Sequence, residues 1–230
     1  MFESKYSKVL TVILVIVIVA IIGLLGFLAF DFFQNYMVSK DASSTVEDFK
    51  GKVNSGSDVA GDGQSTTNDG ENPFDKIASS NTSGGNTNAE TDSLPLYKGF
   101  EMLGTMVIPA TNFEYPILNE PATKAKIETA VALQWGAGIN QVGNSVIVGH
   151  NYRNGLFFSN NKKLQIGDKI YITDNSGTEL TYTIYDKFET SDSDTSFFQR
   201  DTQGKPEVTL STCTDDSSGR LIILARVEDY

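Results

Sequence analysis

Two patterns of apolar residues divide the chain into an N-terminal and a C-terminal part. Near the N-terminus, Val9 to Phe30 is a run of 22 residues without a charge. As a helix this run would be about 33 Å long, close to the hydrocarbon thickness of a bilayer. Lys5 and Lys8 precede the run and Asp31 follows it, so the positive-inside rule predicts a cytoplasmic N-terminus. A cleaved signal peptide is the alternative, but the run is long for one and no small-x-small cleavage site follows it.

The segment from Ser39 to Ser93 has a different composition. Of its 55 residues, 36 are Ser, Thr, Asn, Asp or Gly. Such a segment buries too little apolar surface to offset the entropy of ordering it, so we predict a flexible linker with a reach on the order of 40 Å. Apolar residues scattered over 31–50 leave room for the helix to continue beyond the membrane. The predicted domains are an N-terminal tip and membrane anchor (1–38), a disordered linker (39–93) and a folded domain (94–230).

In the folded domain the apolar residues form short alternating or continuous runs, which are typical of β-strands. The spacing in Ala122 to Leu133 predicts a helix, and Leu156 to Leu164 predicts a short helix or turn that packs on the core. A polar loop is expected over 190–205. Many short strands separated by turn residues indicate a mainly β domain, a closed or nearly closed barrel with minor helices. The predicted strands cover 104–109, 115–118, 144–149, 169–173, 179–189, 208–212 and 221–227.

The last two predicted strands bring two chemically useful side chains together. Cys213 ends the strand 208–212 and Arg220 begins the strand 221–227, with six turn-forming residues between them. If these strands pair as a hairpin, the two side chains become neighbours. His150 also follows directly on an apolar strand.

Charge and composition narrow the possible chemistry. The net charge of −11 argues against nucleic acid or an anionic lipid surface as the main partner. One cysteine and one histidine allow no internal disulfide, and no zinc site unless carboxylates complete it. Acid pairs in the turns, such as Asp215 and Asp216, are better explained as solvated turn residues than as calcium ligands. We therefore expect no metal and no cofactor.

Cysteine, histidine and arginine at strand ends are suited to acyl transfer. A thiol activated by an imidazole is a strong nucleophile, and the same imidazole can protonate a leaving amine. An arginine fork can stabilise the oxyanion. The alternative from composition is a buried, inert cysteine with a structural histidine and a solvated arginine. Arg226 competes with Arg220, but it lies six residues further, about 20 Å along an extended strand.

Specific motifs in this domain resemble those of the sortases. Thr209-Leu210-Ser211-Thr212-Cys213, followed by Arg220 and an apolar strand, resembles their active-site signature. Val146 to Asn151 (V-I-V-G-H-N) resembles the histidine motif, and Leu164 to Ile170 resembles the L-x-x-G-D-x-I run that follows it. The resemblance covers Leu103 to Val227, with the motifs in family order. It leans towards class B-like or pilus-associated groups, although the loop 190–205 is short for the extra helix of class B.

The resemblance implies a membrane-anchored cysteine transpeptidase on an eight-stranded sortase β barrel. On the matching positions, Cys213 is the nucleophile, His150 the general acid and base, and Arg220 the residue that holds substrate and oxyanion. Thr212 and Asn151, which lie next to the nucleophile and the histidine, are candidate substrate-binding residues.

The partners implied are secreted proteins with a C-terminal sorting signal of the Leu-Pro-X-Thr-Gly type. The acyl acceptor is an amine of a cell-wall precursor or a pilin lysine, and the setting is the outer face of a Gram-positive cell membrane. Two alternatives remain: a hydrolase that passes the same thioester to water, and a catalytically idle, tethered binding module.

Overall fold

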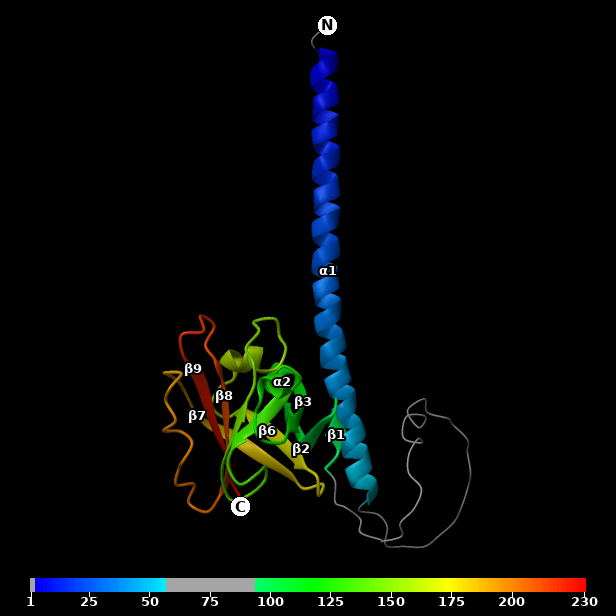
Figure 1. Ribbon diagram of the computed structural model, residues 1–230. Helices are drawn as coiled ribbons and strands as arrows, with labels where there is room; N and C mark the ends of the chain where they lie inside the picture. The colour runs from blue at the N-terminus through cyan, green and yellow to red at the C-terminus, as the bar shows by residue number, and fades with distance from the viewer. Residues whose placement is uncertain (1–2, 57–93) are drawn as a thin grey trace, which may run out of the picture.

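The computed structural model describes residues 3–56 and 94–230, and it consists of one long helix and a β barrel (Figure 1). The helical elements are α1 (Glu3–Gly56), η1 (Pro109–Thr111), α2 (Lys124–Ile127) and η2 (Phe158–Lys163). The strands are β1 (Leu96–Tyr97), β2 (Phe100–Ile108), β3 (Phe113–Leu118), β4 (Val131–Trp135), β5 (Gly143–Val148), β6 (Lys169–Asp174), β7 (Glu179–Thr190), β8 (Pro206–Cys213) and β9 (Arg220–Val227).

Eight strands, β2 to β9, form the closed barrel that the sequence predicted. Their order is β2-β3-β4-β5-β8-β9-β7-β6, and β6 pairs back onto β2 to close the ring. The short β1 is added outside the ring through its antiparallel pairing with β2. Two of the pairings are parallel, β3 with β4 and β5 with β8, and the rest are antiparallel.

The barrel interior is filled by alternating apolar side chains. Met106, Ile147 and Ile223 are fully buried members of this core. β9 is covered on both faces, which accounts for its near-continuous apolar sequence. Its outward residues Ile222 and Leu224 pack in a second cluster with Phe197 from the loop after β7. That loop is therefore part of the packed structure.

The helix predicted over Ala122 to Leu133 is wrong for most of its length. Helix α2 covers only Lys124–Ile127, and Thr123 caps its first turn by accepting a hydrogen bond from the backbone N–H of Lys126. From Val131 the chain forms β4, whose first residues pair in parallel with β3. The spacing of a short apolar run fits a helix and a strand equally well. This run lies between two neighbouring strands of the sheet, and pairing with them stabilises the strand.

The predicted linker boundary at Ser39 is wrong, because residues 39–56 are helical. α1 continues without a break to Gly56. Its side chains at Ala42, Val46 and Phe49 are 0%, 3% and 7% exposed. These positions share one face of the helix, and they pack against the barrel beside β2 and β3. The apolar residues are few, but Ala42 and Phe49 belong to apolar clusters that include barrel residues. The rest of the predicted linker, 57–93, lies outside the described residues.

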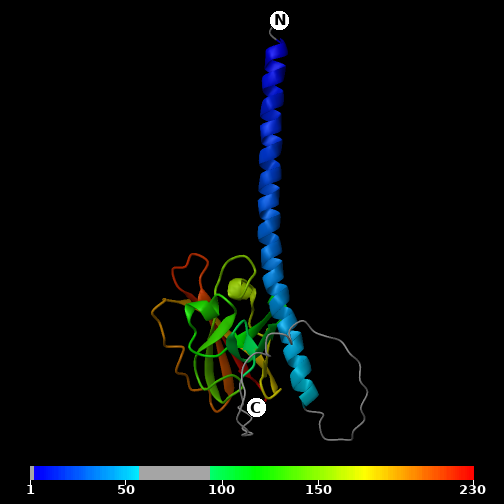
Figure 2. The ribbon, with the colours of Figure 1, turned by 45° about the vertical axis from the view of Figure 1, so that its right-hand side comes forward.

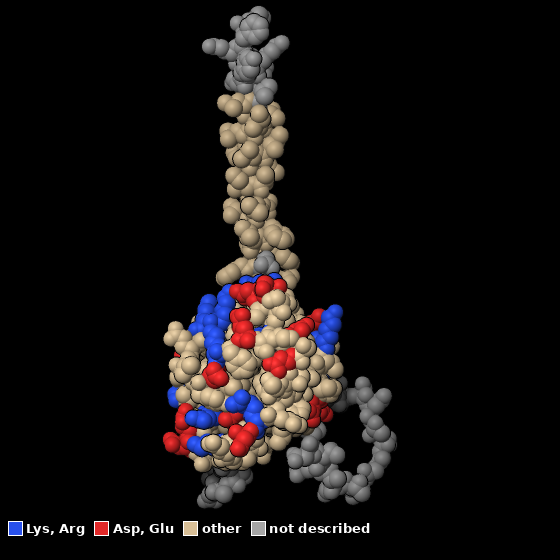
Figure 3. Space-filling view, turned by 90° about the vertical axis from the view of Figure 1, so that its left-hand side faces the viewer, with Lys and Arg blue, Asp and Glu red and all other residues tan. Residues whose placement is uncertain are grey.

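The N-terminal part of α1 projects far beyond the barrel (Figures 1 and 2). Within the described residues it is the one helix long and apolar enough to cross a membrane, judged by length and composition. Figure 3 shows that the described part of the projecting segment carries no charged side chain, whereas Lys, Arg, Asp and Glu cover the barrel. A membrane-spanning α1 is consistent with this division.

Candidate active site

The β8–β9 hairpin brings Cys213 and Arg220 together, as the sequence predicted. The two residues are directly paired across the hairpin. Nη1 of Arg220 donates a hydrogen bond to Sγ of Cys213 at 3.0 Å. A guanidinium at this distance stabilises negative charge that develops on the sulfur.

The turn between the two residues is held by its own polar groups. The backbone N–H of Thr214 donates to the carbonyl of Gly219 at 3.0 Å. Asp216 accepts hydrogen bonds from the hydroxyl of Thr214 and from the backbone N–H of Ser218. These bonds, the first above all, lower the pKa of Asp216 to about 2. Asp216 is thus explained by its hydrogen bonds within the turn. These bonds keep the ends of β8 and β9 at a fixed separation.

His150 is brought to Cys213 by the parallel pairing of β5 with β8. In this pairing Val148 lies opposite Ser211, and the backbone N–H of Gly149 donates to the Ser211 carbonyl at 3.3 Å. His150 and Cys213 each follow this last pair by two residues, and Asn151, next to His150, donates to the carbonyl of Cys213 at 3.0 Å. No hydrogen bond joins the two side chains in the described part of the chain, and Nε2 of His150 is buried without a partner there. An unpartnered ring nitrogen next to a thiol can accept or return a proton.

The surroundings of His150 favour its neutral form. Its ring stacks on Tyr152 at a centroid distance of 4.7 Å. Burial lowers the pKa of His150 below its ordinary value of 6.5, and the positive charge of Arg220 acts in the same direction. The carboxylate of Glu128 opposes them by raising the pKa. At neutral pH the imidazole is therefore available as a base.

The other two predicted site residues hold the site together. The side-chain amide of Asn151 donates to the backbone carbonyl of Cys213 and to the carboxylate of Asp215, each at 3.0 Å. It thereby ties the loop after His150 to the hairpin. Thr212 is 1% exposed, and its hydroxyl donates to the carbonyl of Gly149 at 2.7 Å. A substrate contact by the Thr212 side chain does not fit this geometry, because the side chain of the residue before Cys213 faces the packed interior.

Arg226, the competing arginine, lies away from the site. Its guanidinium covers the ring of Tyr185 at 4.8 Å. In the sheet it is paired with Thr183 of β7 and Glu207 of β8, at the far end of both strands from Cys213. The structure thus brings Arg220, and not Arg226, to the cysteine.

A cleft of about 290 Å³ is lined by Arg220, the residue that donates to Cys213. Its walls combine apolar side chains of the α2 region with the loop after β7, and Arg220 and Ser211 line it as well. The lining residues are Ala122, Ile127, Gln134, Val148, Asp192, Asp194, Thr195, Phe197, Phe198, Ser211 and Arg220. A partly apolar cleft of this kind can hold peptide side chains beside Arg220.

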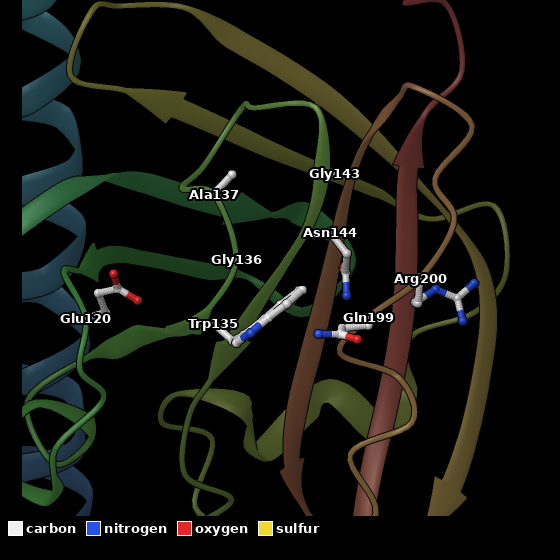
Figure 4. A pocket seen from close by; sticks show the side chains of 8 residues that line it. All are labelled: Glu120, Trp135, Gly136, Ala137, Gly143, Asn144, Gln199 and Arg200. Atoms are coloured by element: carbon white, nitrogen blue, oxygen red, sulfur yellow. The ribbon is translucent and has the colours of Figure 1, made fainter.

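A second cleft, of about 660 Å³, lies beside the start of β5 (Figure 4). Figure 4 shows the indole of Trp135 and the side chain of Gln199 reaching into it, with the carboxylate of Glu120 on the opposite side. The ring of Trp135 contacts that of Phe198 at a centroid distance of 5.9 Å. Because Phe198 lines the first cleft, this aromatic pair separates the two.

Sequence reasoning missed three contributors to the site: Tyr152 on the histidine, Glu128 near it, and the pair Phe197 and Phe198 in the cleft. Adjacent aromatic residues inside an otherwise polar loop were a usable signal, because such residues need a surface to cover. Asp194, in the same loop, accepts hydrogen bonds from the hydroxyl of Thr190 and the N–H of Ser196.

Among the described residues, no group of three or more His, Cys, Asp or Glu side chains could hold a metal ion.

Comparison with known proteins places this fold in one family. Residues 106–228 match the family model described as "Sortase domain", which is more than half of the chain. Sortase A of Bacillus anthracis is 29% identical over 132 residues, which are 54% of this chain and 58% of that protein.

Solved structures agree. Sortase A from Corynebacterium diphtheriae has a TM-score of 0.51 at 27% identity and is matched over 57% of this chain and 62% of that chain. A Clostridium perfringens Sortase D5 transpeptidase has a TM-score of 0.50 at 28% identity, over 55% of this chain and 79% of that one. The chain spans about three fifths of the length of the two sortase A proteins that it matches. From the family match and the shared fold, the chain belongs to the sortase family.

Proposed function

We propose that the chain is a membrane-anchored cysteine transpeptidase that cleaves a sorting motif in secreted proteins. The observation that carries the proposal is the hydrogen bond from Arg220 to Sγ of Cys213 at the edge of a peptide-sized cleft. A buried, inert thiol would not be paired with a guanidinium at a cleft. The register of β5 and β8, which ends two residues before His150 and Cys213, supports His150 as the proton carrier.

The first half-reaction forms a thioester. The Sγ of Cys213 attacks the carbonyl carbon of the scissile peptide bond, and the carbonyl oxygen becomes an oxyanion. Arg220 donates to this oxyanion, which is the charge that preorganised donors stabilise best. His150, which has taken the thiol proton, gives it to the leaving amine as the carbon–nitrogen bond breaks.

The second half-reaction transfers the acyl group to a new amine. An acceptor amine enters, His150 removes its proton, and the nitrogen attacks the thioester carbon. The carbon–sulfur bond breaks, and Cys213 is released. We propose that the motif is of the Leu-Pro-X-Thr-Gly type and that the amine belongs to a cell-wall precursor or a pilin lysine. If water replaces the amine, the same site acts as a hydrolase.

The anchor is proposed from the N-terminal part of α1. Val9 to Phe30 would cross the membrane, the N-terminus would lie in the cytoplasm and the barrel outside, as the flanking Lys5, Lys8 and Asp31 predict. Protease treatment of intact protoplasts should then digest the barrel or release it, and a fully protected barrel would contradict this orientation.

The covalent step is tested by trapping the acyl group. The purified chain is incubated with a library of sorting peptides, with and without hydroxylamine, and analysed by intact-protein mass spectrometry. We expect one acyl adduct on Cys213, faster peptide turnover with hydroxylamine, and no adduct in Cys213→Ala. Peptide cleavage that persists in Cys213→Ala would end the proposal. Turnover that hydroxylamine and other amines leave unchanged would identify a hydrolase, and an absence of any adduct across the library would favour an idle binding module.

A further inference from the structure

α1 lies along the whole length of the barrel. At one end, the side-chain amide of Asn154 donates to the side-chain oxygen of Asn35 at 3.2 Å. At the other end, Val53 lies against the β6–β7 turn, where a Cβ at Gly177 would come within 2.4 Å of a Val53 methyl group. From residue 35 to residue 53 a helix rises about 27 Å. The two contacts therefore fix the positions of both ends of the barrel along the axis of α1.

Between these ends the helix is held by buried and by charged contacts. Ala42, Val46 and Phe49 are buried on the barrel side. The carboxylate of Asp41 pairs with Lys98 at 2.7 Å and accepts from the hydroxyl of Tyr97 at 3.0 Å. Further along, Lys50 pairs with Glu179 at 2.7 Å, and Ser43 bonds to Glu114. Contacts spread over several turns resist both tilting and sliding, so α1 and the barrel form one body.

The catalytic end of the barrel is the end nearest the apolar run. Asn154 belongs to the loop after His150, and its neighbour Arg153 donates to the hydroxyl of Ser217 in the turn after Cys213 at 2.7 Å. Both loops thus lie near the level of Asn35. In Figures 1 and 2 they face the N-terminal end of α1, whereas the C-terminus of the chain lies at the opposite end.

The distance to the bilayer follows from the helix. Asn35 is five residues beyond Phe30, the last residue of the apolar run, a rise of about 7.5 Å. The headgroup layer on each side of the hydrocarbon is roughly 5–8 Å thick. Tyr152, the ring that stacks on His150, is 43% exposed on this end, and tyrosine is a residue type enriched at membrane interfaces.

We propose that the docked half of α1 holds the barrel with its catalytic end against the phospholipid headgroups. The site then acts on substrates whose reactive groups are held at the membrane surface, and a substrate held further out does not reach it. This inference rests on the membrane anchor of the proposed function and on no step of the proposed chemistry. Its test therefore measures position, not activity.

The position is read by fluorescence quenching in vesicles. The full chain carries Cys213→Ala, which removes the only thiol, together with either Ser218→Cys in the β8–β9 turn or Asp229→Cys beyond β9. Each variant is labelled with a fluorophore and reconstituted with lipids that carry a nitroxide on the headgroup. We expect the Ser218→Cys label to be quenched at least threefold more than the Asp229→Cys label. Equal quenching, stronger quenching at position 229, or no quenching of either label would overturn the proposal.

A length change of α1 tests the same geometry in a second way. Seven helix-forming residues inserted between Phe33 and Gln34 add about 10.5 Å and turn the helix by only about 20°, so that the docking contacts are kept. We expect the Ser218→Cys label to lose most of its quenching. The same seven residues inserted after Gly56, behind the docked segment, should leave it unchanged and serve as the matched control. Quenching that survives the first insertion would mean that the barrel position does not depend on α1.

The insertion also predicts a difference between substrates. With Cys213 intact, we expect the insertion to leave cleavage of a soluble sorting peptide unchanged and to lower cleavage of the same peptide, linked through a short spacer to a lipid, at least tenfold. Equal rates on the lipid-linked peptide before and after insertion would contradict the proposed height of the site. Inactivity on both peptides in the original chain would count against the proposed function, while the quenching result would still decide the orientation.

Discussion

Replacement of Arg220 tests the central contact of the site. Arg220→Ala removes the guanidinium that donates to Sγ of Cys213 at 3.0 Å. Loss of one preorganised oxyanion donor typically lowers the rate by about 10²- to 10³-fold, or about 2.7–4 kcal/mol of transition-state stabilisation. Arg220 also lines the cleft, so weaker peptide binding should add a rise in KM. Arg220→Lys keeps the charge but not the fork, and we expect an intermediate rate.

The matched control is Arg226→Ala, since Arg226 is an arginine of the same strand. Its guanidinium contacts the ring of Tyr185 at 4.8 Å, an interaction worth about 0.5–2 kcal/mol. We therefore expect lower stability and a nearly unchanged rate. The assay is single-turnover acylation of Cys213, followed by rapid quenching and mass spectrometry. If Arg220→Ala acylates within threefold of the unchanged chain, or if Arg226→Ala shows the larger loss, the assignment of Arg220 is wrong.

Three further predictions concern the histidine and the residue before the cysteine. His150 is the only histidine, so its imidazole resonances can be followed by NMR in a tag-free protein. We expect a pKa of His150 below 6.5 that rises in Arg220→Ala, because the charge of Arg220 lowers this pKa. A constant or lower pKa in the variant would refute the electrostatic argument. Because the folded pKa is lowered, the stability linked to His150 should be fully present above pH 6.5 and decrease as the pH falls towards the folded value, which urea unfolding at several pH values can measure. In Thr212→Val the carbonyl of Gly149 loses its hydroxyl donor. We expect the free energy of unfolding to fall by about 1–3 kcal/mol, with little change in peptide binding. A large rise in KM in the folded variant would instead identify Thr212 as a substrate contact.

The sequence predicted those parts of the site that depend on local pairing. Cys213 and Arg220 are joined by a hairpin with a short polar turn, so strand pattern and turn chemistry were enough to bring them together. For His150 the family resemblance implied only a role, and the long-range pairing of β5 with β8 became evident only in the structure. The role of Thr212 could not be read in the same way, because which face of a strand meets the interior is decided by its neighbours.

Features that depend on distant surfaces were missed. The docked half of α1 contains few apolar residues, and Ala42, Val46 and Phe49 become significant only because β2 and β3 supply a matching surface. The average composition of residues 39–93 did not reveal this apolar face of α1. Similarly, Val131 was assigned to a helix because its parallel partner in β3, Ile117, is not adjacent in sequence.

The parallel pairing of β5 with β8 also determines when the site comes into existence during folding. Cys213 and Arg220 are seven residues apart, and hairpins form within about 1–10 μs. His150 is 63 residues from Cys213, and long-range parallel pairing requires the closure of a large loop, which is slow. We therefore expect Cys213 to meet Arg220 earlier in folding than it meets His150. In the proposed mechanism acyl transfer needs all three side chains, so we expect a partly folded chain that has formed only the β8–β9 hairpin to be inactive.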